Sequence, residues 1–475
     1  MTKTKLFAFA VLLAFALGAY QLATAQEGRP PEDTAAQAEQ ATAPDQAAQP
    51  EIFTPQGTVI TPESSVVRAE DAGLRAHTNV HIFVPAGGQL SSPVPNFTFA
   101  ETPASLGCVY GVGPAYAGCK PSTGGTLHPT GGWGAIALVD AYDNPRAAAD
   151  LATFSAHFGL PAANFTKVYA NSSFGTLNGL SASCSGTPAG NVGWGLEEDL
   201  DIQWAHAMAP SAKIILVEAC SSSYNDLLYA EQVAGMKVYA AGGGDISNSY
   251  GSGEFPGEVN YDSFFFRYYW QNVTYFASAG DSGWGAAYPS SSPWVVSAGG
   301  TTVNRDASGN FLNESCWSGS GGGVSQYELW QSPPNSNSNG MGPWSGYQYE
   351  LFLGYPYASA PRVTPDLSFD ADPHSGVYVY DTYGYGGFVI VGGTSVASPS
   401  LAGIVNNANN RLGTAVPSAY YTGENNLLYS QLNAVTAYPT NFYDVTKGSN
   451  GTGHNAGPGY DQCTGIGSPR GKLGK

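Results

Sequence analysis

The sequence predicts an α/β protein with a parallel sheet that is covered by helices on both faces. Apolar runs of strand length recur in the second part of the chain, notably at 134–141, 212–219, 273–280 and 294–301. Strands buried on both faces read as nearly continuous apolar runs, and helical stretches such as 145–160 supply the crossovers that parallel strands need. Reactive groups in such sheets gather at the carboxyl ends of the strands, so we expect a site at that edge.

The chain divides into four parts. Residues 1–25 predict a secretory signal, because two lysines precede a short apolar run and an Ala-Thr-Ala cleavage motif; a retained anchor is the alternative. Residues 26–56 are rich in Ala, Gln and Pro and predict a disordered linker. A small N-terminal extension is expected at 57–126, and the α/β domain at 127–475. Within that domain, the Gly/Ser/Asn/Pro-rich segment 318–362 predicts a long surface insertion.

The charge balance excludes some partners. The chain carries 36 acidic and 18 basic residues, a formal charge of −18, and only 11% of its residues are charged. Nucleic acids and anionic membranes are therefore not expected as partners. Few basic groups also mean little charge repulsion within the chain in acid, which suits a protein that works at low pH. A secreted protein that is merely rich in Gly, Ser and Tyr explains the composition equally well.

The six cysteines agree with export to an oxidising compartment, either outside the cell or in a periplasm. None of them forms a C-x-x-C pair, which argues against zinc and thioredoxin-type chemistry. Cys108 and Cys119 close a small loop and predict a disulfide. Two further bridges are expected, but the sequence leaves their pairing open.

Ser395 occupies a position that suits a nucleophile. It follows Gly392-Gly393-Thr394, where the apolar run 386–393, expected as another strand of the sheet, passes into an apolar helical stretch. A helix N-terminus offers free N–H groups and a positive dipole to a developing oxyanion, and Pro399 is expected near the first turn, where a missing N–H costs least. The alternative is a simple helix cap.

No histidine is placed to activate this serine. A subtilisin-type base would stand in a His-Gly pair that opens a helix, and none of the seven histidines precedes glycine. Asp140 and Asp143 could imitate the triad aspartate, but they have no such histidine to orient. A Ser-His-Asp hydrolase is therefore disfavoured.

An acidic helix occupies the region where that base would be expected. At about 100° per residue, a helix over 194–209 has one apolar seam, and Glu197 and Asp201 project at its edges. Glu198 and Asp199 are expected to point to water. Acids at a buried edge are costly unless they share a proton or serve chemistry; the alternative is that all four face solvent.

A third candidate acid is Asp281, just past the apolar strand 273–280. Gly280 and Gly283 allow the backbone to turn sharply and to approach a ligand there. The alternative is an aspartate that only stabilises a turn.

Together these segments resemble the sedolisin (serine-carboxyl peptidase) family, from about Leu127 to Lys475. The resemblance includes a Glu three residues before Leu-Asp, then "WAHAMAP", "SAGDSG" and "GGTSxxxP" in that order. It implies a subtilisin-like fold and a serine-type endopeptidase that is active in acid. The implied catalytic residues are Ser395 as nucleophile, Glu197 as general base, Asp201 as its hydrogen-bond partner, and Asp281 in the oxyanion hole beside the Ser395 N–H.

Simple acid–base chemistry explains such a set. In acid a histidine with a pKa of about 6.5 is protonated and cannot accept a proton, whereas a glutamate of about 4.3 still can. Asp281 must be neutral to donate a hydrogen bond to an oxyanion. Since both demands are met only at low pH, we expect activity in acid that is lost near neutrality. Glu197 and Asp201 are expected to share a proton, so the apparent pKa values of these two carboxyls belong to the pair.

The C-terminal segment also resembles the family, at its calcium site. The resemblance implies one structural Ca²⁺, held by the carboxylates of Asp444 and Asp461 and by the carbonyls of Val445, Gly457 and Gly459. An ordinary turn-rich loop is the alternative. Three further aspartates are expected to be structural only: Asp366, Asp370 and Asp372.

The leading hypothesis is a secreted, monomeric endopeptidase acting on peptides or proteins, without a membrane partner once the signal is removed. The alternatives are the histidine-dependent hydrolase and a secreted binding protein that has kept the scaffold without turnover. The family usually carries a pro-segment of well over a hundred residues. Either 57–126 is a reduced pro-segment or the enzyme matures without one.

Overall fold

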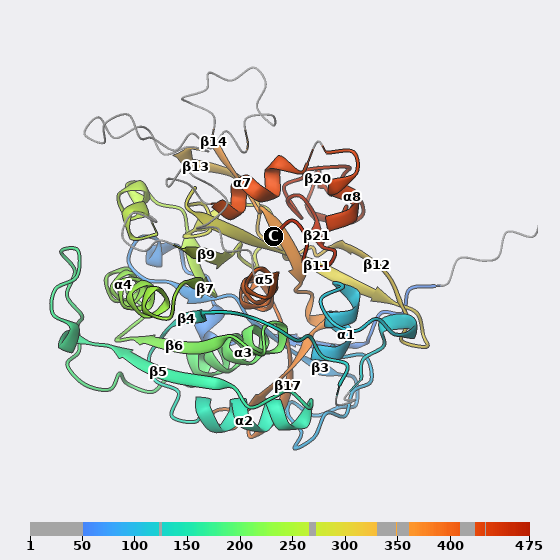
Figure 1. Cartoon of the computed structure of the whole chain (residues 1–475), viewed down its shortest axis with the longest axis horizontal. Helices are drawn as coiled ribbons and strands as arrows, with labels where there is room; N and C mark the ends of the chain where they lie inside the picture. The colour runs from blue at the N-terminus through green and yellow to red at the C-terminus, as the bar shows by residue number, and fades with distance from the viewer. Residues whose placement is uncertain are drawn as a thin grey trace, which may run out of the picture. The chain divides into compact units, whose positions relative to one another are not determined.

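The predicted apolar runs form the strands of an eight-stranded sheet (Figure 1). Its order is β12-β11-β9-β7-β4-β6-β5, with β15 paired to β11. All neighbours are parallel except β11 and β12. The strands are β4 Ala135–Ala141, β5 Asn164–Ala170, β6 Lys213–Ala219, β7 Gly244–Asn248, β9 Val273–Ser278, β11 Val295–Arg305, β12 Phe311–Cys316 and β15 Leu367–Asp370.

The computed structural model describes residues 51–122, 126–265, 272–329, 348, 361–408, 423–432 and 434–475. The predicted signal and nearly all of the predicted linker lie outside these residues, as does most of the predicted insertion at 318–362.

Helices cover both faces of the sheet, as predicted. Ile136 and Leu138 of β4 pack in one core with α2 Ala147–His157, α3 Val192–Met208 and α5 Thr394–Ala408. The alternate β4 residues Ala135, Ala137 and Val139 pack in a second core with α4 Tyr224–Ala240 on the opposite face. Successive side chains of a strand point to opposite faces, which is why one fully apolar run serves both cores.

The N-terminal region 57–126 is built into the domain through two smaller sheets. One is antiparallel in the order β1-β3-β17-β16, with β1 Gly57–Ile60, β3 His81–Pro85, β16 Val377–Asp381 and β17 Gly387–Gly392. The expectation that the run before Ser395 belongs to the parallel sheet is therefore wrong. A short connection joins β16 and β17 into a hairpin, which forces an antiparallel pairing.

The other small sheet has the order β10-β8-β2, with β2 His77–Thr78, β8 Tyr250–Gly253 and β10 Ala287–Tyr288. It brings the N-terminal region to the end of β7. The remaining elements are α1 Pro103–Val109, β13 Gly323–Leu329, β14 Pro361–Thr364, α7 Gly423–Ser430, α8 Ala437–Asn441, β18 Phe442–Tyr443, β19 Ser449–Gly451, β20 His454–Asn455 and β21 Ser468–Pro469.

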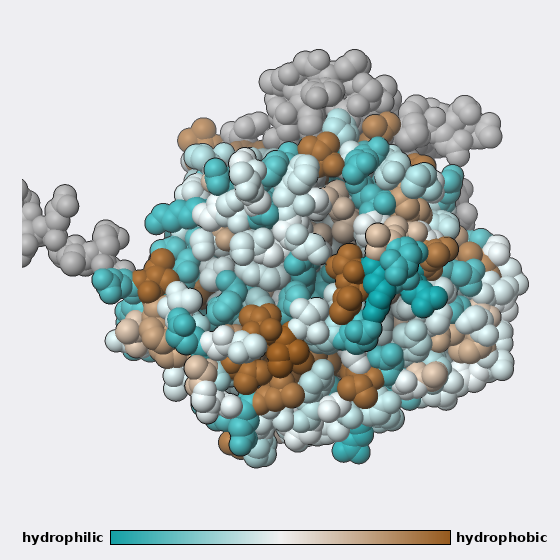
Figure 2. Space-filling model, turned by 180° about the vertical axis from the view of Figure 1, so that it is seen from behind, coloured by the Kyte–Doolittle hydropathy of each residue, from teal (hydrophilic) through white to brown (hydrophobic). Residues whose placement is uncertain are grey.

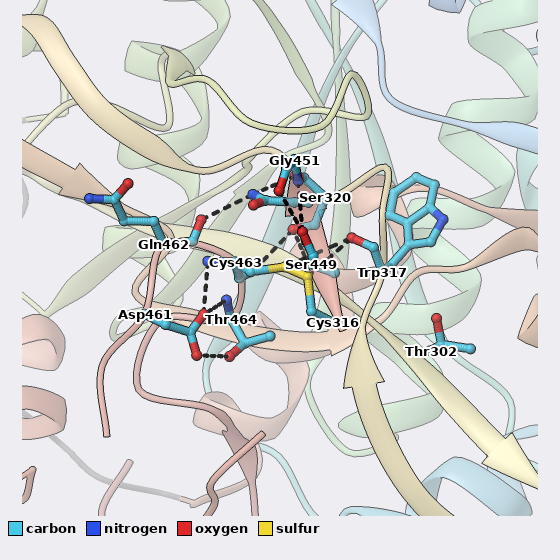
Figure 3. Close-up of a disulfide and its surroundings, with 12 residues drawn as sticks. Thr302, Cys316, Trp317, Ser320, Ser449, Gly451, Asp461, Gln462, Cys463 and Thr464 are labelled. Carbon is cyan, nitrogen blue, oxygen red and sulfur yellow. Dashed lines mark hydrogen bonds between the residues drawn. A yellow bond between two sulfur atoms is a disulfide. The ribbon is translucent and has the colours of Figure 1, made fainter. Parts of the chain in front are cut away.

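Three disulfides are present. Cys108–Cys119 is the predicted one, with a Cα–Cα distance of 5.3 Å. The pairings left open by the sequence are Cys184–Cys220 and Cys316–Cys463. The last bridge ties the end of β12 to the C-terminal loop that holds Asp461 (Figure 3).

The three aspartates expected to be structural do hold the fold together. Asp366 forms a fully buried ion pair with Arg362, Asp370 accepts a hydrogen bond from Ser375 Oγ at 2.5 Å, and Asp372 caps the short turn 373–375. None of these bonds involves the Ser395 region, so the structural interpretation stands.

On the face seen in Figure 2, hydrophobic residues gather in a few patches between hydrophilic and intermediate ones. Among the described residues, no helix is both long and apolar enough to cross a bilayer.

Candidate active site

Ser395 stands at the start of α5, directly after a sharp turn that follows β17. Gly393 makes this turn with φ +118°, in a region that favours glycine. Pro399 is the sixth residue of α5, further along the helix than expected. Because proline has no N–H, the Ser395 carbonyl loses its usual helical partner, and the Ser249 hydroxyl oxygen lies 3.4 Å from it.

The Ser395 hydroxyl lies in a closed environment and is fully buried. It donates to the Ser249 carbonyl at 3.2 Å and accepts a hydrogen bond from the Asn79 N–H, also at 3.2 Å. The Ser395 backbone N–H donates to the Asn79 carbonyl oxygen at 3.1 Å. Sequence reasoning missed both Asn79 and Ser249, because neither stands in a recognisable motif.

The acidic helix α3 forms where it was predicted. Asn191 caps it, since its side-chain oxygen accepts hydrogen bonds from the N–H groups of Gly193 and Trp194 at 3.0 and 3.1 Å. Glu197 and Asp201 are fully buried, in agreement with their place at the edge of the apolar seam.

The expectation that Glu198 and Asp199 face water is wrong. Both are fully buried, because α3 is packed against α2, α5, the central sheet and β16 and has no open face. Asp199 accepts a hydrogen bond from Asn144 Nδ2 at 2.9 Å, and burial followed by the Glu218 carboxyl of β6 raises the pKa of Glu198.

Glu197 lies in a group of buried carboxyls with few hydrogen-bond donors. Burial raises its pKa well above the ordinary value, the Asp140 carboxyl raises that pKa further, and the Ser395 hydroxyl lowers it. Neither oxygen of Glu197 has a hydrogen-bond partner. The Ser395 hydroxyl is thus the neighbour that favours the ionised, proton-accepting form of Glu197.

Asp201 and Asp140 complete this carboxyl cluster. Asp201 accepts a hydrogen bond from Ser249 Oγ at 2.7 Å, and burial, Asp140 and Glu197 raise its pKa in that order. Asp140, at the end of β4, is fully buried with both oxygens unpartnered. The sequence singled it out only as a triad aspartate without a histidine. We call Asp140, Glu197 and Asp201 the carboxyl cluster.

Asp281 contacts Thr394, the residue that precedes Ser395. Its Oδ1 accepts hydrogen bonds from the Thr394 N–H and Oγ1, both at 2.8 Å. Its Oδ2 lies 3.4 Å from His81 Nε2, and a methyl group at Gly393 would collide with both this oxygen and the Asn79 carbonyl oxygen. Burial raises the pKa of Asp281 to about 7, so below neutrality it carries a proton that it can donate.

The predicted catalytic residues are therefore brought to one place. A buried hydroxyl has a carboxyl cluster on one side, and on the other a backbone N–H and a carboxylic acid that lie beside the same carbonyl oxygen. Such an arrangement can remove a proton from the serine and stabilise negative charge on a carbonyl oxygen.

Some of the predicted calcium ligands are in contact in the C-terminal loop, as Asp444 with Gly459 and Asp461 with Gly457. Gly459 N–H donates to both Asp444 oxygens at 3.1 Å, and Tyr438 hydroxyl contacts Asp444 Oδ1 and the Gly459 carbonyl. Asp461 accepts hydrogen bonds from the backbone of Cys463 and Thr464 at 2.8 Å (Figure 3). Carboxylate and carbonyl oxygens are of the type that Ca²⁺ takes, so the chemistry of these residues is compatible with a calcium ion.

A second group of acids was not expected from the sequence. Asp150, Asp199 and Asp381 are buried, with ligand oxygens within 4.8 Å of one another. Thr382 donates to Asp150, and the Gly384 and Tyr385 N–H groups donate to Asp381. This group shares no residue with the predicted calcium site.

Comparison with known proteins places these observations in a wider context. No protein-family model matches the chain. It is 29% identical over 373 residues to kumamolisin of Bacillus sp. (strain MN-32), which covers 71% of this chain and 58% of the relative. It is 32% identical over 229 residues to sedolisin of Pseudomonas sp. (strain 101), which covers 42% of this chain and 33% of the relative.

A solved structure agrees with these sequence similarities. Pseudomonas sedolisin, a serine-carboxyl proteinase complexed with pseudo-iodotyrostatin, aligns with a TM-score of 0.57 at 23% identity, over 79% of this chain and 96% of that one. The chain thus has the subtilisin-like fold of that structure and is similar in sequence to kumamolisin and sedolisin, in agreement with the resemblance of the motifs. It spans between a third and about three fifths of the length of the two curated relatives.

Proposed function

We propose that the chain is an acid-active serine-carboxyl endopeptidase. Ser395 attacks the scissile carbonyl carbon, and Glu197 accepts the hydroxyl proton and returns it to the leaving amine. Asp201 lies close enough to Glu197 for that carboxyl to raise its pKa. It positions Glu197 by sharing a proton with it. The Ser395 N–H and the protonated Asp281 stabilise the oxyanion, and water then releases the acyl group.

One observation carries the proposal most strongly. The Glu197 carboxyl neighbours the buried Ser395 hydroxyl, and burial places the pKa of Asp281 at about 7. Asp281, which ionises near neutrality and must be protonated to donate, sets the alkaline limit of the working range. The rate maximum therefore lies on the acid side of neutrality.

The test is a digest of casein across the acid and neutral range by the wild type and by Ser395→Ala, Glu197→Ala and Asp281→Ala. The proposal expects cleavage in acid by the wild type and loss in each variant. Glu424→Gln is a matched control, because Glu424 is a buried acid of α7 with a raised pKa of about 8. Full activity at neutral and alkaline pH that survives Glu197→Ala would refute the assignment.

The proposal includes one structural Ca²⁺, held by the carboxylates of Asp444 and Asp461 and by the carbonyls of Val445, Gly457 and Gly459. The ion would hold the C-terminal loop against the domain. It would take no part in proton transfer, since these ligands belong to a loop separate from the residues around Ser395.

Export is also part of the proposal. The signal predicted at 1–25 and the three disulfides fit an oxidising compartment outside the cytoplasm. The expected partners are peptide or protein substrates, and we propose a monomer.

A further inference from the structure

The Asn79 carbonyl group marks the position that the carbonyl of a substrate would take. Its oxygen accepts the Ser395 N–H at 3.1 Å, and it lies beside Asp281 Oδ2 in the space above Gly393. A carbonyl oxygen that accepts from the nucleophile's own N–H, next to a carboxylic acid, lies where negative charge would develop during attack. The Asn79 side chain therefore shows where the side chain on the acyl side of a cleaved bond would lie.

The backbone before this carbonyl shows how a substrate strand would be held. The strand β2 pairs antiparallel with β8, with His77 opposite Gly251, and it is the outer strand in the order β10-β8-β2. An extended peptide bound at such an edge takes its main-chain hydrogen bonds from the sheet, and its side-chain positions give the specificity. Because one strand fits beside β8 at a time, a substrate binds in place of residues 77–79, in the same register.

The Asn79 side chain is enclosed and makes a hydrogen bond at one end. The residue is 1% exposed, its Nδ2 donates to Ser278 Oγ at 2.6 Å, and its Oδ1 has no hydrogen-bond partner. The Ser278 hydroxyl is directed at the Asn248 carbonyl oxygen, 3.5 Å away. Since a serine hydroxyl has one proton, Ser278 then presents a lone pair to the Asn79 amide. Ser278 thus favours a side chain that carries a hydrogen-bond donor.

The size of the side chain is limited by β8 and β10. A methyl group at Gly251 would lie 3.8 Å from Asn79 Nδ2, 3.1 Å from the Tyr288 carbonyl oxygen and 3.9 Å from Ala287 Cβ. Gly251 therefore lies at the amide end of Asn79, with the backbone of β10 next to it. A side chain much longer than asparagine, such as an aromatic ring, would have to displace one of these strands.

We propose that Ser278 determines the specificity of the protein and that asparagine is the preferred residue on the acyl side of the bond that is cleaved. The inference rests on the proposed peptidase function and names its substrate class, which is peptides with a donor-bearing side chain of about the size of asparagine. Leucine has nearly the same shape but no donor, so it would leave the Ser278 oxygen unpaired in a closed space. Phenylalanine fails on size as well.

The direct experiment compares matched peptide substrates. The peptides have the sequence of residues 76–83, with asparagine, leucine or phenylalanine at position 79, and kcat/KM is measured with the full chain at a pH where it digests casein. The asparagine peptide is expected to exceed each of the other two by about tenfold or more. Leucine cut as fast as asparagine would overturn the role of the donor, and phenylalanine cut as fast would overturn the limit on size.

A pair of variants tests Ser278 itself. Ser278→Ala removes the acceptor, so the ratio of kcat/KM between the asparagine and leucine peptides is expected to fall toward one. Ser155→Ala is the matched control, because Ser155 is a buried serine of α2 whose hydroxyl donates to the Leu151 carbonyl of the same helix. It is expected to keep the wild-type ratio. The ratio is insensitive to the fraction of folded enzyme, and an unchanged ratio in Ser278→Ala would overturn the proposal.

The two proposals fail in different ways. A full chain that digests casein in acid but cuts the leucine or phenylalanine peptide as well as the asparagine peptide overturns the specificity and leaves the peptidase intact. A full chain that cuts neither casein nor any of the three peptides at any pH overturns the proposed function.

Discussion

The protein buries acids in two contrasting ways. In the carboxyl cluster, five of the six oxygens lack a hydrogen-bond partner; Asp201 Oδ1 is the exception. Elsewhere in the domain, Asp366 has Arg362, the Ser297 N–H and the Tyr429 hydroxyl around it, and Glu101 has Arg305 and Ser105.

This contrast separates acids that hold the fold from acids that can move protons. An ionised carboxylate surrounded by donors is fixed in one protonation state, whereas a buried carboxyl without donors keeps its proton until a neighbour accepts or supplies one. Other buried acids also lack partners on both oxygens, namely Glu198, Asp262 and Glu424. We assign chemistry to the carboxyl cluster because it both lacks donors and includes Glu197, whose pKa the Ser395 hydroxyl lowers.

The largest expected effect comes from removing the proton acceptor. Glu197→Gln should lower kcat by about 10²–10⁴-fold, because the amide cannot take the serine proton. The melting temperature should not fall, since a buried group without partners is replaced by a neutral one of the same shape. Steady-state kinetics on a peptide and a thermal melt check both points, and a variant with near wild-type kcat would contradict them.

The paired acids should behave in the opposite way. Arg362→Met leaves Asp366 as a buried charge without its cation and should cost about 3–5 kcal/mol of unfolding free energy. Below the melting temperature, kcat should be nearly unchanged. Urea unfolding measures the first quantity, and a loss of kcat in fully folded protein would show that the two groups of acids are not independent.

Chelation should produce a smaller effect, on stability alone. With the ion at about 100 times its dissociation constant, removal should lower the unfolding free energy by about 2.7 kcal/mol. Asp444→Asn should lower the melting temperature of the calcium-loaded protein and reduce its response to chelator. An unchanged melting temperature on chelation would contradict the proposal of a structural calcium ion.

The smallest change concerns Asp140. Its carboxyl raises the pKa of Glu197, so Asp140→Asn should move the acid limb of kcat/KM toward lower pH. Acids with raised pKa in the folded state stabilise it most at low pH and lose that contribution as pH rises. The same variant should therefore be relatively more stable than wild type near neutrality. An acid limb at the same pH in the variant and the wild type would show that Asp140 does not affect the pKa of Glu197.

The strands of the sheet and the burial of Glu197 and Asp201 could be predicted from local sequence. The packing that buries the remaining faces of α3 could not. Apolar runs such as 134–141 predict strands because both faces are buried, and the spacing of Glu197 and Asp201 places them beside the apolar seam. Periodicity assigned Glu198 to water because it shows only one apolar face. The layers that cover the rest of α3, and partners such as Glu218, come from distant segments.

The same limit explains why Asn79 was missed. No property of "AHTNVHIF" marks one asparagine as the residue over the nucleophile. Its position depends on the pairing of β2 with β8 and of β3 with β17, which joins segments more than 150 residues apart. The run before Ser395 was assigned to the wrong sheet for the same reason.

The most direct test of the central claim is the pH profile of kcat/KM for the wild type and Asp281→Asn. The wild type should lose activity as pH rises through about 7, where the Asp281 carboxyl ionises and can no longer donate to the oxyanion. The amide cannot ionise, so in Asp281→Asn this loss should move to higher pH or disappear. Identical alkaline limbs in the two proteins would contradict the account.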